Sequence, residues 1–246
     1  MAIWDWSYAA NILPVLLQAF GTSLVITLEA FAGAVVLGAF IAWSLETGGK
    51  AGKVTAALSD FIRKTPILVQ LYFVYFVLPD IGIVLSAWIT GVLTLAIHYG
   101  FYLAEVYRAG IRTVPAGQVE AARALALRRT IIFRKVILPQ ALPIIMPNAG
   151  NYFIYMLKDT PYLSAISVVE VMRVSYRLGG DYFRYIEPFT IAGILFLLSS
   201  WGASLLVGLM ERRMRGGWAR RWTTTWATCS KRFPVRLTSS SPTRHT

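Results

Sequence analysis

The chain has too few charged residues for an ordinary soluble domain. Only 15% of its 246 residues are charged and 56% are hydrophobic, whereas soluble domains carry about 25% charged residues. The apolar residues also fall in runs longer than a soluble core can use. These features exclude a soluble globular enzyme and indicate an integral membrane protein.

Cysteine and histidine are equally scarce. The single cysteine, Cys229, excludes an internal disulfide and a thiolate metal cluster. The two histidines, His98 and His245, offer little to a metal centre or a catalytic triad, and we expect His98 to be packed and hydrogen-bonded. The chain also lacks a phosphate-binding loop of the form G-x-x-x-x-G-K-[ST]. We therefore expect no enzymatic activity and no metal or nucleotide bound by this chain.

Five segments fit the roughly 20 apolar residues that a helix needs to cross a membrane. We place these spans near 19–44, 54–79, 83–104, 137–157 and 188–209. The second span requires Arg63 and Lys64 to reach toward the lipid headgroups. The sequence thus predicts an all-α integral membrane protein with three parts, which are a periplasmic or interfacial segment (1–18), a transmembrane domain (19–213) and a basic, disordered tail (214–246).

Basic residues are concentrated where one orientation puts the cytoplasm. The formal net charge is +12, and 20 of the 24 Lys and Arg side chains lie in 46–64, 108–135 and 211–246. Because cytoplasmic loops are enriched in these residues, we expect the N-terminus outside and the C-terminus in the cytoplasm. The basic residues lie between apolar runs, so we attribute the charge to a lipid membrane and not to nucleic acid.

Prolines and amides gather in the fourth predicted span. Pro139, Pro143 and Pro147 recur at every fourth position, and Asn148 and Asn151 follow them. Each interior proline removes a backbone hydrogen bond, and irregular backbone survives in a membrane only where protein or a water-filled cavity surrounds it. The pattern favours a solute path over a kinked packing helix.

Glu29 is an ionisable residue inside the first predicted span. A membrane-embedded carboxylate is a candidate functional group, and it could meet a cationic or zwitterionic solute. The alternative is a structural carboxylate near the outer interface, hydrogen-bonded to Thr22 or Ser23.

A short amphipathic helix is predicted at 118–129, in the cytoplasmic part of the chain. Its alanines present a shallow surface that arginines border. Such a helix can dock a soluble partner, or it can lie in the membrane interface against anionic lipid.

Four motifs occur in one order along the chain: Phe61–Leu71 (FIRKTPILVQL), Glu105–Arg112 (EVYRAGIR), Glu120–Leu127 (EAARALAL) and Leu157–Ser164 (LKDTPYLS). The third resembles the EAA loop of importer permeases of the ATP-binding cassette (ABC) superfamily. The others are similar to segments of the branch that moves polar amino acids, the histidine, glutamine and arginine type. Order and spacing agree from about Gly21 to Arg213.

The resemblance implies a type I importer fold of five transmembrane helices per subunit, in the bacterial cytoplasmic (inner) membrane. It implies a second permease subunit in a homodimer or heterodimer, two copies of an ATP-binding subunit and an extracytoplasmic solute-binding protein. The partner ATPase would bind ATP and magnesium. The EAA loop would be a coupling helix that docks on the ATPase through Glu120, Ala121, Ala122, Leu125 and Ala126.

The family's Lys-Asp-Thr motif matches Lys158, Asp159 and Thr160, which are expected to form an outer gate or, alternatively, an interfacial ion pair. The translocation path and gate would then comprise these three residues together with Glu29, Pro143, Pro147, Asn148 and Asn151. The family usually has glycine where this chain has Ala126 and Lys64. An alanine would be strained at the first of these positions if the turn needs a positive φ.

The sequence therefore predicts a permease subunit that imports amino acids or related small polar solutes. Compatible solutes such as ectoines, or opines, are alternative cargoes. An ion-coupled secondary transporter would predict paired intramembrane ionisable groups and an internal repeat. A membrane-embedded assembly factor would lack a kinked span that carries amides.

Overall fold

The computed structural model describes residues 4–232, with side chains as far as Met214. The regular secondary structure of this part is entirely helical, as the sequence predicts. The helices are α1 (Trp6–Thr47), α2 (Gly49–Lys64), α3 (Ile67–Tyr72), α4 (Ala87–Arg112), α5 (Ala116–Ala124), α6 (Arg129–Ile132), α7 (Leu138–Asp159), α8 (Val171–Tyr182) and α9 (Ile186–Arg232). Short π or 3-10 turns are η1 (Phe73–Val77), η2 (Leu78–Ile81), η3 (Phe133–Ile137) and η4 (Thr160–Ile166).

Four stretches of the described chain are long and apolar enough to cross a membrane: α1, α4, Arg129–Ile166 and Ile186–Met214. The structure divides the predicted second span, 54–79, into two helical parts. Its two parts, α2 and Ile67–Ile81, pass the same criteria only as a pair bent by 106°. The break falls at Thr65–Pro66 because proline has no N–H to donate and disfavours helical backbone at the residue before it.

Both end helices are longer than the predicted spans. Asp5 caps α1, because its side chain accepts hydrogen bonds from the backbone N–H groups of Ser7 (2.9 Å) and Tyr8 (3.1 Å). Helix therefore covers 6–18, most of the predicted N-terminal segment. At the other end α9 continues to Arg232, into the stretch expected to be a disordered tail, and 233–246 lie outside the described residues.

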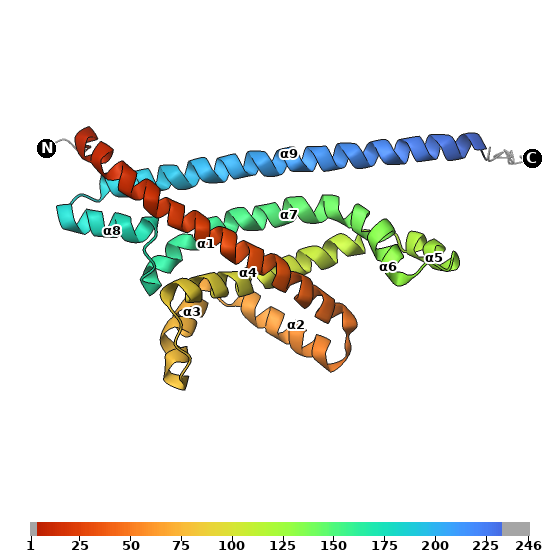
Figure 1. The fold of residues 1–246 in the computed structure, drawn as a ribbon, viewed down its shortest axis with the longest axis horizontal. Helices are drawn as coiled ribbons and strands as arrows, with labels where there is room; N and C mark the ends of the chain where they lie inside the picture. Colours follow the sequence, from red (N-terminus) through yellow and green to blue (C-terminus); the bar gives the residue numbers. More distant parts are fainter. Residues whose placement is uncertain (1–3, 233–246) are drawn as a thin grey trace, which may run out of the picture.

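Figure 1 shows α1 crossing the bundle diagonally, with α9 along one side and α8 beside the start of α9. α5 and α6 lie at the opposite end from α8, and α3 with the turns after it projects away from the bundle (Figure 1). One apolar cluster joins the middle of α1 to α3, α4 and α7. A second joins the first half of α1 to α8 and α9.

The crossing of α1 and α4 depends on small residues. A Cβ atom added to Gly38 would lie 3.0 Å from the carbonyl oxygen of Gly100 and 3.0 Å from the Cβ of Leu103. Ala34, one turn before Gly38, is fully buried. The two backbones therefore meet closely, as small residues allow in membrane helices.

A group of charges joins the start of α1 to the turn before α9. Arg184 donates hydrogen bonds to Glu187 (2.6 Å) and Asp5 (3.3 Å), and the backbone N–H of Asp5 donates to Glu187 (3.0 Å). The Glu187 side chain is only 1% exposed. Its buried charge depends on the Arg184 guanidinium for compensation.

Glu170 caps α8 from a buried position between two spans. Its carboxylate accepts hydrogen bonds from the backbone N–H groups of Met172 (2.8 Å) and Arg173 (2.7 Å). Burial outweighs these two hydrogen bonds and raises the pKa of the Glu170 carboxyl to about 7. The folded protein therefore favours the protonated form of this side chain more than the unfolded chain does.

We expect Gly38→Val to lower the free energy of unfolding by about 1–3 kcal/mol, because the added methyl groups would collide with the α4 backbone. Thermal unfolding in a mild detergent measures the effect. The matched control is Gly21→Val in the same helix, since a Cβ at Gly21 meets nothing within 4 Å. Equal destabilisation by both variants would contradict the proposed close packing.

Glu170 also predicts a pH dependence of stability. Its folded pKa, about 7, is above the ordinary value of 4.5, so its contribution to stability is fully present below about pH 4.5 and is lost as the pH rises through about 7. We expect the melting temperature to fall over this window and Glu170→Gln to flatten the slope. Asp181→Asn, which changes an exposed acid of α8, should leave the slope unchanged.

Candidate functional site

The helix predicted at 118–129 is shorter in the structure and ends at Ala124. Ala126 ends it in left-handed backbone, with φ 53°, and the N–H of Ala126 donates to the carbonyl of Arg123 at 2.8 Å. The positive φ that would strain an alanine is therefore present. A left-handed conformation costs a residue with a Cβ about 1–2 kcal/mol, which glycine avoids.

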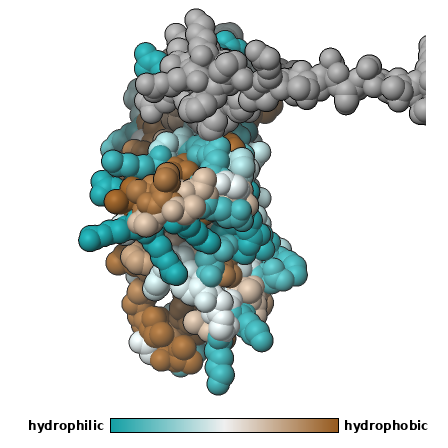
Figure 2. Space-filling view, turned by 90° about the vertical axis from the view of Figure 1, so that its right-hand side faces the viewer, coloured by the Kyte–Doolittle hydropathy of each residue, from teal (hydrophilic) through white to brown (hydrophobic). Residues whose placement is uncertain are grey.

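Most of the predicted docking surface is open at the end of the molecule. Glu120, Ala121, Leu125 and Ala126 are exposed, Leu125 by 74%, whereas Ala122 is buried against the chain itself. Figure 2 looks onto this end, where hydrophilic side chains project around apolar patches.

A hydrogen bond ties this surface to the fourth span. The Gln140 amide at the start of α7 donates to the Gln118 side chain in α5 at 2.6 Å. Together with the burial of Ala122, this contact holds α5 against the base of α7.

The predicted path residues of α7 fall on different sides of the helix. Asn148, Asn151 and Lys158 are exposed, whereas Pro147 is buried and Pro143 is half-buried. The exposed residues recur at a spacing of three or four, which puts them on one face together with Tyr155, a residue that the sequence analysis missed. We call Asn148, Asn151, Tyr155 and Lys158 the α7 stripe.

Asp159 and Thr160 point into the bundle. The Tyr99 hydroxyl of α4 donates to the Asp159 carboxylate at 2.6 Å, and buried Thr160 donates to the carbonyl of Leu157 at 2.8 Å. Among the described residues no ion pair joins Lys158 to Asp159. The carboxylate is instead held by a tyrosine of the neighbouring helix.

Gln70 joins the two halves of the broken span. Its Nε2 donates to the carbonyls of Ile62 (2.8 Å), in the last turn of α2, and Thr65 (2.9 Å), at the break. Since both partners only accept, the amide oxygen must face His98 Nδ1, at 3.1 Å. The oxygen cannot donate, so the Nδ1–H of His98 donates to it. His98 is thus packed and hydrogen-bonded, as expected.

Tyrosine rings connect α4 to α7 beside these groups. The ring centroids of Tyr102 and Tyr152 are 5.4 Å apart, and those of Tyr152 and Tyr155 are 5.8 Å apart. Tyr99 lies 6.2 Å from Tyr152. Aromatic faces attract cations, so this cluster adds a feature suited to a cationic group, which spacing within one helix could not reveal.

Among the residues that the structure describes, Glu29 does not make the hydrogen bond with Thr22 or Ser23 that a structural role near the outer interface would predict. It accepts a hydrogen bond from the Trp88 indole N–H at 2.9 Å, at the start of α4, and neither Thr22 nor Ser23 donates to it in the described chain. The side chain is exposed on the surface of the subunit.

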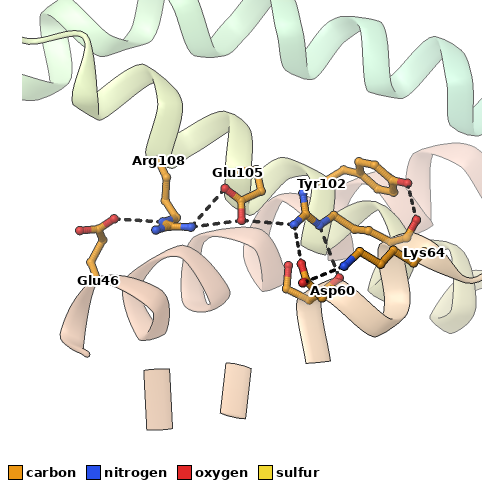
Figure 3. A network of polar contacts seen from close by, with 8 residues as sticks. Glu46, Asp60, Lys64, Tyr102, Glu105 and Arg108 are labelled. Carbon is orange, nitrogen blue, oxygen red and sulfur yellow. Dashed lines mark hydrogen bonds and ion pairs between the residues drawn. The ribbon is translucent and has the colours of Figure 1, made fainter. Parts of the chain in front are cut away.

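Figure 3 shows alternating charges that link α1, α4 and α2. The Arg108–Glu46 and Arg108–Glu105 contacts are 3.0 and 3.1 Å long, and Glu105 approaches Arg63 at 3.8 Å. Two ion pairs within α2 complete this series of charges, Arg63–Asp60 (3.3 Å) and Lys64–Asp60 (3.0 Å). We call this set the ionic chain: Glu46, Arg108, Glu105, Arg63, Asp60 and Lys64.

The described residues contain no cluster of His, Cys, Asp and Glu suited to a metal ion.

Comparison with known proteins places this arrangement in a family. Residues 34–216 match the model of the "Binding-protein-dependent transport system inner membrane component" family. The chain is 39% identical to a probable amino-acid ABC transporter permease, y4tG of Sinorhizobium fredii, with 84% of this chain and 90% of that one covered. It is 33% identical to the glutamine transport system permease GlnP of Escherichia coli, over 86% of this chain and 98% of that one.

A solved structure shares the fold. It is described as the crystal structure of an amino acid ABC transporter with histidines, and it superposes with a TM-score of 0.81 at 34% identity, covering 85% of this chain and 99% of that one. The chain therefore belongs to the family of inner membrane components of binding-protein-dependent transport systems, as an amino-acid permease of the ABC importers.

Proposed function

We propose that this permease is driven by two copies of a separate ATP-binding subunit, which docks on α5 and the turn after it. The docking surface comprises Glu120, Ala121, Leu125 and Ala126, while the predicted fifth member, Ala122, is buried beneath it. The exposure of Glu120, Ala121, Leu125 and Ala126 at this end of the molecule supports this, because a partner can reach all four side chains without displacing the rest of the chain. ATP and magnesium would bind to the partner and not to this chain.

The contacts of α5 explain how ATPase movement would reach the solute. Because the Gln118–Gln140 hydrogen bond joins α5 to α7, displacement of α5 moves the base of the helix that carries the α7 stripe. Rigid-body movement of this kind alternates the side of the membrane to which a central site opens.

We infer a membrane topology of five spans, in which the second crosses the membrane through Ile67–Ile81 and the loop that follows it, beyond the bend that ends α2. The N-terminus lies outside and the C-terminus in the cytoplasm, because the stretches rich in Lys and Arg then face inward. A second permease subunit, in a homodimer or heterodimer, completes the path, and a solute-binding protein delivers the solute from outside.

Asp159 is the group that we expect to meet the ammonium of an amino acid. Its carboxylate lies between α4 and α7 beside the tyrosine cluster, and opposite charges attract strongly away from water. Lys158 has the charge to bind the solute carboxylate. Asn148 and Asn151 offer amide hydrogen bonds further along the same helix.

The remaining predicted path residues have weaker support. Thr160, Pro143 and Pro147 shape the backbone of the path and its gate, and Glu29 can face it only if the second subunit covers the exposed side of α1. Ectoine-like solutes and opines also carry a cation beside a carboxylate, so they remain alternative cargoes.

Glu120→Lys should abolish copurification of the ATP-binding subunit with the tagged permease from native membranes in mild detergent. The substitution reverses a charge on the exposed docking surface. The matched control is Asp80→Lys, which reverses an exposed acid at the far end of the broken span. If both variants or neither lost the ATPase, α5 would not be the specific docking helix.

Asp159→Asn should reduce uptake of labelled L-glutamine at least tenfold, because an amide keeps the shape of the side chain but loses its charge. Tyr99→Phe removes the 2.6 Å hydrogen bond and keeps that charge, so a smaller reduction is expected. Copurification of the ATPase should be normal in both variants. Equal uptake by Asp159→Asn and the unaltered protein would remove this carboxylate from the solute path.

A further inference from the structure

Helix α2 carries an apolar stripe that the rest of the chain leaves uncovered. Val54, Leu58 and Phe61 are exposed by 68%, 48% and 64%. Their spacing of four and three residues puts them on one face. In the whole helix only Gly52 and Ser59 are buried.

The ends of the stripe carry cations. Lys50 and Lys53 are exposed at the start of α2 and make no ion pair among the described residues, and Lys64 lies at its end beside Asp60. A helix with an apolar face and lysines along its border is typical of segments that lie in a membrane interface.

The opposite side of α2 holds the bundle by polar contacts. Arg63 approaches Glu105 of α4 at 3.8 Å, and the Tyr102 hydroxyl donates to the Arg63 carbonyl at 3.1 Å. Near the start of α2, Thr55 and Ser44 share a hydrogen bond of 2.8 Å. These contacts turn the polar side inward, so the apolar stripe faces away from the subunit.

The chain turns sharply at both ends of α2. Gly48 and Gly49 have φ angles of 69° and 66°, a conformation suited to glycine. At the other end the chain bends by 106° before Ile67. The chain therefore changes direction at both ends of α2, so α2 need not follow the direction of the spans.

We propose that α2 lies in the headgroup layer of the cytoplasmic leaflet, with its apolar stripe among the upper acyl chains and Lys50 and Lys53 on the phosphates of anionic phospholipids. The choice of leaflet rests on the proposed orientation of the permease. Charge complementarity favours this lipid, because the cytoplasmic leaflet attracts polybasic segments. Through Arg63 and the ionic chain, the lipid surface is then connected to α4.

The depth of α2 can be measured with a fluorescent label. In a Cys229→Ser background, Leu58→Cys is labelled with an environment-sensitive dye, and the purified permease is reconstituted in vesicles of phosphatidylcholine and phosphatidylglycerol. We expect a quencher attached near the lipid headgroups to act more strongly than one near the ends of the acyl chains. Leu197→Cys in α9 is the deep control, and Gly117→Cys at the exposed start of α5 is the aqueous control.

Two outcomes would overturn the proposal. Stronger quenching by the deep quencher, as at Leu197, would make α2 part of a membrane-crossing helix. No quenching by either lipid, as at Gly117, would mean that a second subunit or another protein surface covers the stripe, or that it faces water.

The lipid charge is tested separately. The quenching of the label on Leu58→Cys reports the ratio of α2 inserted in the lipid to α2 outside it. Adding phosphatidylglycerol to phosphatidylcholine vesicles should increase this ratio by ~5-fold for each lysine that contacts the headgroups. Lys50→Gln with Lys53→Gln should remove this dependence, whereas Arg128→Gln with Arg129→Gln, an equal charge change at the start of α6, should retain it. Loss of the dependence in both double variants, or in neither, would contradict a specific role of the α2 lysines.

The orientation has its own readout. Lys50→Cys in the Cys229→Ser background should resist a membrane-impermeant maleimide in intact cells and react after lysis. Reaction in intact cells would refute the proposed orientation of the permease, while the quenching profile would still decide whether α2 lies in a headgroup layer.

Discussion

The close approach of α1 and α4 positions most of the functional groups. With Gly38 against the carbonyl of Gly100, the α4 backbone is fixed beside the longest apolar helix of the described spans. α4 in turn directs Tyr99 to Asp159, His98 to Gln70 and Glu105 to Arg63. A displacement of α4 would therefore disturb the path, the broken span and the ionic chain together.

The helices are held together by contacts of different kinds and strengths. Apolar burial joins α1, α4 and α7, and a second apolar cluster joins α1 to α8 and α9. In contrast, α2 is attached to the bundle mainly by hydrogen bonds and ion pairs. Such pairs are worth little where water reaches them, so this attachment is the one that a small change in free energy can release.

Features that act along one helix were predictable from the sequence. Apolar runs gave the bounds of α7 to within two residues, whereas α4 continues to Arg112, eight residues beyond the predicted end at 104. The positive φ on which strain at Ala126 depends is also present. The polar spacing on α7 also contained Tyr155, although the prolines suggested a different face. Helical boundaries were predicted less well where a single cap decides them, as Asp5 does for α1.

Contacts between distant segments could not be read from one sequence. Gln70 and His98 lie 28 residues apart, and Trp88 lies 59 residues from Glu29, so no local pattern pairs them. The break at Thr65–Pro66 was visible as a proline, but its direction depends on Gln70 and on the packing of α3 against α4. Tertiary packing, not local propensity, decides these features.

The alanine at position 126 has an evolutionary consequence. Glycine at this turn would relieve the strain of the left-handed backbone, but it would also give the unfolded loop more conformations to lose, a cost of about 0.4–1 kcal/mol. At a positive φ the strain outweighs this entropic cost, so glycine would be the more stable residue at this turn. The more rigid alanine narrows the range of shapes open to the turn after α5. Selection for alanine at this position would then act on the stiffness of the link between α5 and the fourth span, against a small cost in folding stability.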